Sequence, residues 1–526
     1  MNTILFRILL IAALLLSLLS KAQEIKVNVA IDQKYQTIEG FGAALAFYEN
    51  WLTVHPNKAE IYEAIFNELS LDILRVRNAH EYDAAMIGRV KEFINASVKT
   101  QGRPIPFLST SWGPPARLKS NNSMKNGGTL KYTVTNGKVE FNYAGFADWW
   151  NASLDEYQAN GIYPTYISIQ NEPDYVATWE SCLLNPFEKV NTTDTLAGYK
   201  QALKAVHDKV STRTNVPRFL GPESIGIGYN AVKNYLLHAD TTLLYGVAHH
   251  LYHGVDKENP WVNTEMKNLN TLYPKLKFFQ TEYSGSDWFN LSGLIYKSLV
   301  DEEVSAYLYW DLIWDKGGLV SLENPWSSGS WKNPKGYEKR KEFYVFKQYS
   351  AFIHPGWQRV DVTLASSEVN AVGFISPAND SLAVVVINRS TTSEKSIRFD
   401  IPGFDYYQSG MHVTNMNSNC KFEGELKEPV YVVSPHSVNT AFFTKTFKTG
   451  NDQFMQDQQS AVSVYPNPFN NFIHIEGKPE NEVWKLCTID GRMVQTGTES
   501  KIDGSGLKSG VYLLKVNHQI LKVMKQ

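Results

Sequence analysis

From about residue 37 to residue 355, short apolar runs alternate with longer stretches whose apolar residues recur at helical spacing. A short apolar run bounded by turn residues is typical of a buried strand, and a period near 3.6 residues indicates an amphipathic helix. The candidate strands cover residues 40–45, 73–77, 105–110, 166–170, 218–220, 246–251, 277–281 and 306–310. Eight such repeats predict an α/β fold, a (β/α)8 TIM barrel over residues 37–355, with a doubly wound open sheet as the alternative.

The pattern changes after residue 356, where the helical period disappears and strand-like runs follow one another closely. Examples are residues 371–375, 382–388, 429–433 and 440–444. Residues 25–31 also alternate, so we expect them to add a strand to the same unit. The prediction is an antiparallel β-sandwich side domain formed by residues 23–36 and 356–447. Residues 448–461, rich in Gln and Asp, predict a linker to a third unit at residues 462–526.

The first 22 residues have the pattern of a secretory signal peptide. Arg7 is followed by an apolar run over residues 8–19, and Ser20 and Ala22 are small residues at positions −3 and −1 before Gln23. This pattern predicts cleavage after residue 22. A membrane anchor is the weaker alternative because the apolar run is short for a bilayer span. We expect no span in the mature protein.

Composition narrows the possible functions. Lys and Arg total 51 against 53 for Asp and Glu, a net charge of −2, which gives no electrostatic basis for binding nucleic acid or an anionic membrane. Cys182, Cys420 and Cys487 are too scattered for a disulfide framework or a metal motif, although one bridge remains open. Aromatic residues make up 13% of the chain. Their flat rings can stack on the C–H-rich faces of sugars.

Two predicted strands end abruptly in a carboxylate. Residues 167–173 read Ile-Ser-Ile-Gln-Asn-Glu-Pro and contain Glu172, and residues 278–283 read Phe-Phe-Gln-Thr-Glu-Tyr and contain Glu282. In a β/α barrel, side chains at the carboxyl ends of the strands point into the active-site mouth. Two carboxylates facing one sugar ring are what hydrolysis of a glycosidic bond requires. We therefore interpret Glu172 and Glu282 as the catalytic pair of a glycoside hydrolase.

An ordered set of motifs across residues 25–447 resembles glycoside hydrolase family 30, within the clan of retaining β/α-barrel enzymes. The motifs are Ile-Glu-Gly-Phe-Gly-Ala (38–43), Ile-Leu-Arg-Val-Arg (73–77), Ser-Trp-Gly-Pro-Pro-Ala (111–116), Gln-Asn-Glu-Pro-Asp-Tyr (170–175), His-Leu-Tyr (250–252), Thr-Glu (281–282), Ala-Tyr-Leu-Tyr-Trp (306–310) and Tyr-Ser-Ala-Phe-Ile-His-Pro-Gly (349–356).

This resemblance implies that Glu172 is the general acid/base and Glu282 the nucleophile. The further residues that it implies are Asn171 for a sugar 2-hydroxyl, Arg75 and Tyr252 for orienting Glu282, and Trp112, Trp310 and Tyr175 as walls of the sugar subsites. Purely structural ion pairs and rim packing are the alternatives for these residues. No cofactor is expected. The run His249-His250-Leu251-Tyr252-His253 lacks a carboxylate or cysteine partner at ligand spacing, so we also expect no metal site.

Within the family, the Gln-Asn-Glu-Pro-Asp-Tyr motif and the side domain most resemble xylanases that act on glucuronoxylan. The resemblance therefore implies a secreted retaining endo-β-1,4-xylanase. Those relatives read a glucuronate branch with an Arg-x-Tyr motif, but this chain has Glu342-Phe343-Tyr344, and its loop 311–326 carries one cation, Lys316. We expect that the branch is not required, unless Lys335 or Arg340 reads it. The alternatives are an endo-β-1,6-glucanase or glucosylceramidase-like specificity and, more remotely, a non-catalytic glycan-binding protein.

Residues 462–526 resemble the C-terminal sorting domain of type IX secretion. The motifs are Val-Tyr-Pro-Asn-Pro-Phe-Asn (464–470), Asp-Gly-Arg (490–492), Leu-Lys-Ser-Gly-Val-Tyr-Leu-Leu (507–514) and Lys-Val-Met-Lys (522–525). This resemblance implies the type IX machinery as a partner and a secreted or cell-surface location. A small sugar-binding sandwich is the alternative. We expect the polysaccharide substrate as the other partner, and a monomer.

Overall fold

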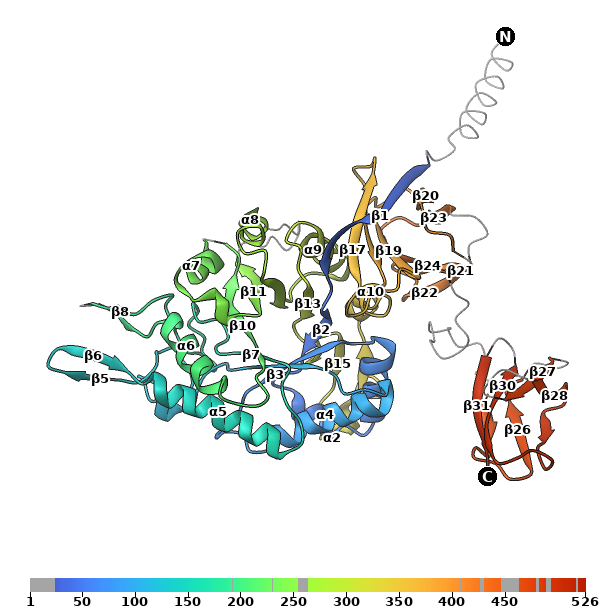
Figure 1. Cartoon of the computed structure of the whole chain (residues 1–526), viewed down its shortest axis with the longest axis horizontal. Helices are drawn as coiled ribbons and strands as arrows, with labels where there is room; N and C mark the ends of the chain where they lie inside the picture. Colours follow the sequence, from blue (N-terminus) through green and yellow to red (C-terminus); the bar gives the residue numbers. More distant parts are fainter. Residues whose placement is uncertain are drawn as a thin grey trace, which may run out of the picture. The chain divides into compact units, whose positions relative to one another are not determined.

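The structure is a computed structural model, and it divides into two units (Figure 1). It describes residues 24–191, 193–228, 230–253, 264–406, 408–425, 430–445, 463–478, 482–488, 493–516 and 519–526. The predicted signal peptide, the predicted linker and the Asp-Gly-Arg motif at 490–492 lie outside the described residues. The first unit contains a barrel and a side sheet, and the second is formed by the C-terminal residues.

Eight parallel strands close into a barrel, so the predicted TIM barrel is confirmed. The strands are β2 (Gly40–Ala44), β3 (Ile73–Arg77), β4 (Phe107–Thr110), β7 (Tyr166–Ser168), β10 (Arg218–Gly226), β11 (Gly246–His253), β12 (Lys277–Glu282) and β13 (Ala306–Tyr309). They neighbour one another in chain order, and β13 pairs with β2 to close the ring. Buried side chains from successive strands, among them Leu108, Leu220 and Phe279, fill the centre. The barrel is therefore a packed core, and only its mouth is available for a ligand.

Helices surround the barrel because each connection between strands carries a helix with an apolar face (Figure 1). In α6 (Tyr199–Val210), for example, Ala202, Leu203, Val206 and Val210 are buried. The other helices are α2 (Glu49–Val54), α3 (Lys58–Tyr62), the π-helix η1 (Glu63–Glu68), α4 (Met86–Gln101), α5 (Tyr143–Ala159), α7 (Ala231–His238), α8 (Thr264–Leu272), α9 (Trp288–Val300) and α10 (Lys341–Ser350), with 3-10 turns η2 (Ala116–Leu118), η3 (Thr241–Leu243) and η4 (Ser328–Ser330).

The side domain predicted as a sandwich is built as one curled nine-stranded sheet. In spatial order its strands are β22 (Lys421–Glu425), β21 (Gln408–Thr414), β24 (Ser437–Thr444), β19 (Ser381–Asn388), β18 (Val369–Ile375), β17 (Gln358–Leu364), β1 (Ile25–Thr37), β20 (Lys395–Asp400) and β23 (Val430–Val433). The expected N-terminal strand is present: β1 pairs antiparallel with β17 and parallel with β20. Gln348 of α10 donates to the Thr414 hydroxyl at 2.9 Å, which joins this sheet to the barrel.

Several connections form small sheets of their own. The strand pairs are β5 (Tyr132–Thr135) with β6 (Lys138–Phe141) and β8 (Lys189–Val190) with β9 (Thr195–Leu196). A three-stranded sheet of β14 (Ile313–Asp315), β15 (Val320–Leu322) and β16 (Tyr337–Lys339) lies in the connection between β13 and α10. This sheet holds the last barrel connection in place beside the mouth.

The C-terminal unit contains two small antiparallel sheets. One consists of β25 (Ser463–Tyr465), β26 (Phe472–Glu476) and β29 (Lys501–Asp503), and the other of β28 (Met493–Gly497), β27 (Trp484–Thr488), β30 (Gly510–Val516) and β31 (Gln519–Lys525). Phe469, Ile473, Leu486, Leu514 and Val523 are buried in its core. This unit therefore has a hydrophobic core of its own.

The structure also bears on the possible disulfide bridge and on a possible membrane span. Cys182, Cys420 and Cys487 are buried, and no disulfide joins them. Among the residues that the structure describes, no helix combines the length and the apolar character needed to span a bilayer.

Candidate active site

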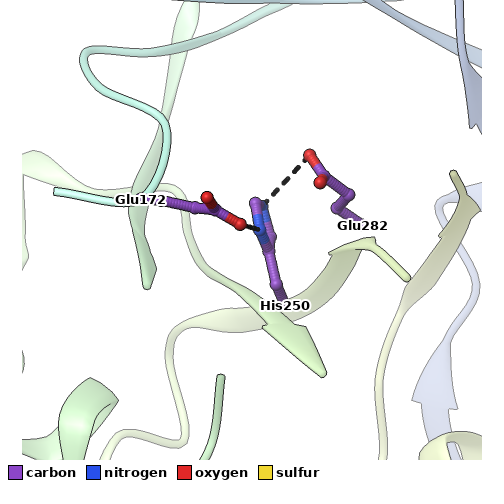
Figure 2. Close-up of side chains that lie close together, drawn as sticks. All are labelled: Glu172, His250 and Glu282. Atoms are coloured by element: carbon purple, nitrogen blue, oxygen red, sulfur yellow. Dashed lines mark hydrogen bonds and ion pairs between the residues drawn. The ribbon is translucent and has the colours of Figure 1, made fainter. Parts of the chain in front are cut away.

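Glu172 and Glu282 meet at the mouth of the barrel, with His250 between them (Figure 2). Glu172 follows β7, Glu282 is the last residue of β12, and His250 lies on β11 between these strands in chain order. One carboxylate oxygen of each glutamate and one ring nitrogen of His250 all lie within 4.8 Å of one another. The barrel thus brings together two carboxylates that are 110 residues apart in the sequence.

Backbone hydrogen bonds hold the segment that carries Glu172. The N–H of Asn171 donates to the Ser111 carbonyl at 2.7 Å, and the N–H of Glu172 donates to the Glu223 carbonyl at 3.0 Å. Glu172 has a φ of 43° and Glu223 a φ of 60°, the left-handed region that side chains of this size rarely adopt. Such strained conformations persist only where the surroundings enforce them, and they cluster at functional sites.

Arg75 of β3 contacts three of the site residues from beneath. Its guanidinium donates to the Glu282 carboxylate at 2.6 Å, to the Glu223 carboxylate at 3.1 Å and to the Asn171 side-chain oxygen at 2.6 Å. Arg75 is fully buried. Because Arg75 engages the amide oxygen of Asn171, the amide N–H groups of Asn171 remain to donate to a ligand.

Glu223 is a third carboxylate of the cluster and was not predicted from the sequence pattern. It is fully buried on β10, with a carboxylate oxygen 3.1 Å from Arg75 and 3.9 Å from the His250 ring. Although burial alone would raise it, the charges of Arg75 and His250 lower the pKa of Glu223 to about 2. The predicted fifth strand ended at residue 220, whereas β10 extends to Gly226. The signal available was a carboxylate three residues beyond the predicted end of that strand.

His250 was also missed as a site residue. Its Nδ1 lies 3.0 Å from a Glu172 oxygen, and its Nε2 lies 3.8 Å from a Glu282 oxygen. Although burial alone would lower it, the negative charges of Glu282, Glu172 and Glu223 raise the pKa of His250 to about 9. The signal was its spacing from Tyr252, since residues two apart on a strand face the same side.

Glu282 is held by a cation and a phenol. Arg75 contacts one of its oxygens, and the Tyr252 hydroxyl donates to the other at 3.0 Å. Burial raises the pKa of Glu282 above its ordinary value, and the positive charges of His250 and Arg75 oppose that rise. The two cations therefore favour the ionised form that a nucleophile needs.

The expected aromatic walls lie close together. Trp112 is buried against Arg75, whose guanidinium carbon is 4.3 Å from the ring centroid, and Trp310 lies 5.9 Å from Trp112. Phe47 contacts both tryptophans edge-on at 6.0 Å and has a φ of 67°. Trp112 thus packs on Arg75, while Trp310 is half-buried. Tyr175 is half-buried, and its N–H donates to the Glu172 carbonyl at 3.0 Å.

The three atoms that Glu172, His250 and Glu282 place within 4.8 Å could suggest a metal site. His250 Nδ1, however, already lies 3.0 Å from a Glu172 oxygen, within hydrogen-bond distance. The surrounding carboxylates raise the pKa of His250 to about 9, so a metal would have to displace the proton that they favour. The hydrogen-bonded contacts are suited to proton transfer and charge stabilisation.

Two cations near the last barrel connection, Arg340 and Lys335, are engaged with carboxylates. Arg340 pairs with Glu342 at 3.0 Å, and Lys335 pairs with Glu60 at 2.6 Å. Glu342 itself is buried in the first turn of α10. The two cations that could have replaced the missing uronate-reading arginine thus already have anionic partners.

Curated relatives match most of this chain at low sequence identity. The glucuronoxylanase XynC of Bacillus subtilis is 24% identical over 423 residues, which are 78% of this chain and 88% of that protein. The lysosomal acid glucosylceramidase of Mus musculus is 22% identical over 427 residues, 68% of this chain and 76% of that protein.

Solved structures share the fold of the barrel and side sheet. The catalytic domain of the family 30 xylanase C from Talaromyces cellulolyticus matches with a TM-score of 0.64 and 20% identity, over 80% of this chain and all of that one. The family 30 subfamily 8 xylanase Xyn30A from Clostridium acetobutylicum matches with a TM-score of 0.60 and 21% identity, over 80% and 99%. An endo-β-1,6-glucanase matches with a TM-score of 0.58 and 16% identity, over 80% and 94%.

The C-terminal unit matches a family model. Residues 463–526 match the secretion system C-terminal sorting domain, which indicates type IX export to the cell surface or beyond. The predicted sorting domain is therefore confirmed, as is the resemblance of the rest of the chain to glycoside hydrolase family 30.

Proposed function

We propose that this glycoside hydrolase is a retaining endo-β-1,4-xylanase that acts outside the cell. The observation that supports retention is the separation of the two carboxylates, whose nearer oxygens lie within 4.8 Å. Retaining glycosidases place their carboxyl groups about 5–5.5 Å apart, whereas inverting enzymes leave about 6.5–9.5 Å for a water molecule.

In the first step, the Glu282 carboxylate attacks the anomeric carbon and forms a glycosyl ester. The bond between that carbon and the glycosidic oxygen breaks, and Glu172 gives its proton to the departing oxygen. Arg75 and Tyr252 hold the two oxygens of Glu282, so the carboxylate reaches the carbon in one orientation. The amide N–H of Asn171 donates to the 2-hydroxyl of the same sugar.

In the second step, water replaces Glu282 at the anomeric carbon. Glu172, now ionised, takes a proton from the water, and the ester bond to Glu282 breaks. The product has the configuration of the substrate because the carbon is inverted twice. His250, which lies 3.0 Å from one Glu172 oxygen, leaves the other oxygen to exchange the proton.

The charges of the cluster support Glu282 as the nucleophile and Glu172 as the acid/base. Arg75 and protonated His250 balance ionised Glu223 and Glu282, so Glu172 can carry the transferable proton without a net charge in the buried site. Glu223 acts through Arg75 and His250, and we assign it as a positioning residue. A buried cluster with balanced charges avoids the cost of an unpaired ion.

Xylan is the favoured substrate because a B. subtilis glucuronoxylanase and two family 30 xylanases are among the proteins that match. Requirement for a glucuronate branch is disfavoured, since Arg340 and Lys335 are already paired. The matching endo-β-1,6-glucanase and glucosylceramidase make another β-linkage the second candidate. A non-catalytic glycan-binding role is weakest, because both carboxylates are present and correctly spaced.

The test is hydrolysis of a polysaccharide panel by the full mature chain, with product anomers followed by NMR. Rapid release of β-anomeric xylo-oligosaccharides is expected. An initial α-anomer would refute retention, and activity confined to β-1,6-glucan would refute the xylanase assignment. We also propose that the mature enzyme is a monomer, which light scattering would check.

A further inference from the structure

His249 is the residue of β11 at which the strand register changes against both neighbouring strands. Against β12, the partner of His249 is Gln280, but the partner of the next residue is Glu282. Thr281 is therefore an extra residue of β12, and the irregularity is a β-bulge. Against β10, the register shifts immediately before His249, and there Glu223 is the extra residue.

The bulge in β12 decides which way Glu282 faces. Phe279 of β12 is packed in the barrel centre. Because side chains alternate along a strand, Thr281 would face the centre as well and Glu282 would face outward. The extra residue instead places Glu282 opposite His250, whose Nε2 lies 3.8 Å from the carboxylate (Figure 2). A slip of one residue between β11 and β12 would turn the proposed nucleophile away from the site.

A buried contact on the outer face of the barrel anchors the side chain of His249. Ala248 is packed in the barrel centre, so the next residue, His249, faces the surrounding helices. Its Nε2 lies 3.1 Å from a carboxylate oxygen of Glu302, and both side chains are fully buried. Glu302 lies in the connection from α9 to β13, and β12 lies between β11 and β13 in the barrel. The contact therefore joins the segments on either side of β12.

Stability alone is a poor explanation for this contact. Gln280 and Tyr307, which pair with each other on β12 and β13 at the level of His249, are also fully buried. Both amide atoms of Gln280 and the Tyr307 hydroxyl have no hydrogen-bond partner among the residues that the structure describes. Apolar residues of similar volume would stabilise such a layer at least as well as a buried pair of charged or polar groups. A role in specifying one strand register accounts for the pair.

We propose that the contact between His249 and Glu302 positions the active site by fixing the register in which β12 presents Glu282. His249 and Glu302 act through the strands and have no contact with the substrate, so they are positioning residues. Adjacent residues of β11 thus have different tasks, because His249 anchors the strand from outside while His250 faces the carboxylates. The Thr281 hydroxyl adds to the anchor by donating to the His249 carbonyl at 3.4 Å. This inference rests on the proposed function and deepens it.

The experiment replaces both partners at once. In His249→Leu/Glu302→Leu neither partner is left buried without the other, so the protein should fold with a melting temperature close to that of wild type. The register loses its anchor, however, and a displacement of about 1 Å at a reacting group can lower the rate about a hundredfold. On the polysaccharide that the wild type cleaves, kcat should fall about ten- to hundredfold. KM should change little, because the groups that bind the substrate are unaltered.

A conservative variant and a matched control complete the comparison. In His249→Gln the amide nitrogen can replace Nε2 as the donor to Glu302, so kcat should stay close to the wild-type value. The control is Ser292→Ala, which removes a fully buried hydroxyl of α9 that lies 3.4 Å from the Tyr349 hydroxyl of α10. It should leave kcat unchanged. The proposal would be overturned by an unchanged kcat in the double variant, or by an equal loss in His249→Gln or Ser292→Ala.

Crystal structures of the wild type and the double variant separate this inference from the function itself. The Tyr252 hydroxyl donates to Glu282 at 3.0 Å, and this distance should lengthen in the double variant as Glu282 turns away. An unmoved Glu282 would refute the role of the pair, whichever substrate is cleaved. If the wild type cleaves no member of the polysaccharide panel, the proposed function fails, and the position of Glu282 still tests the pair.

Discussion

The backbone N–H of Glu172 donates to the backbone carbonyl of Glu223 at 3.0 Å, and both residues have left-handed φ values. This bond joins the end of β7 to the adjacent strand β10. Through its main chain, Glu223 thus contacts the proposed acid/base. Through its carboxylate, it contacts Arg75 and His250. The position and the charge of the catalytic cluster depend on the same residue.

Replacing Glu223 by Gln should move the pH–activity profile to lower pH. The Glu223 carboxylate raises the pKa of His250, so its neutral isostere lowers that pKa from about 9. Removal of a negative charge should favour the ionised form of neighbouring Glu282 and so lower its pKa as well. Both limbs of kcat/KM against pH should therefore shift downward. Glu223→Asp keeps the charge and should restore the profile, a difference that a purely structural role would not produce. Coincident limbs for wild type and Glu223→Gln would contradict this role.

Substitutions of the two proposed catalytic carboxylates should have different effects on activity. Glu282→Ala should abolish turnover on every substrate because no glycosyl ester can form. Glu172→Ala should lower the rate on xylan by about 10²–10⁴-fold, the usual value of general acid–base catalysis. It should spare aryl xylosides with good leaving groups, which need little protonation. Steady-state rates on both substrates provide the measurement, and equal losses would argue against Glu172 as the acid.

Stability should fall at both ends of the pH range. The pKa of Glu223 is lowered from 4.5 to about 2, so its contribution is complete above pH 4.5 and disappears as the pH falls toward 2. The pKa of His250 is raised from 6.5 to about 9, so its contribution is complete below pH 6.5 and disappears as the pH rises through 9. The Glu223 contribution is at most about 3 kcal/mol. Melting temperatures from pH 2 to 10 should fall less steeply on the acid side for Glu223→Gln, and parallel curves would contradict the shift.

Activity on undecorated xylan should be comparable to activity on glucuronoxylan. Reading a uronate through a buried cation contributes about 2–5 kcal/mol in such pairs, and here Arg340 is occupied by Glu342. Glu342→Gln would release Arg340 and should raise the preference for glucuronoxylan. Initial rates on both polymers give the ratio. Cleavage confined to sites beside glucuronate branches would show that another group reads the branch.

The order of apolar and polar residues determined the elements of this protein. Alternating strands and helices predicted the barrel, and all eight barrel strands begin within two residues of their predicted starts, because a buried parallel strand needs an apolar run. The predicted end was wrong for β10, which extends to Gly226. The strand-end position of Glu172 and Glu282 could also be predicted from the local sequence. The same holds for the alternation of apolar and polar residues that placed β1 in the side sheet. The family resemblance supplied the roles expected of Asn171, Arg75 and Tyr252.

Tertiary structure alone decided what surrounds those residues. Glu223 and His250 joined the site because neighbouring strands in the barrel bring their ends together. The two-residue spacing of His250 from Tyr252 indicated a shared face of one strand, but not the closeness of His250 to residues on other strands. Burial also decided the electrostatics of the site. It raises the pKa of Glu282, and the same low polarity strengthens the attraction between the charges of Glu223 and His250.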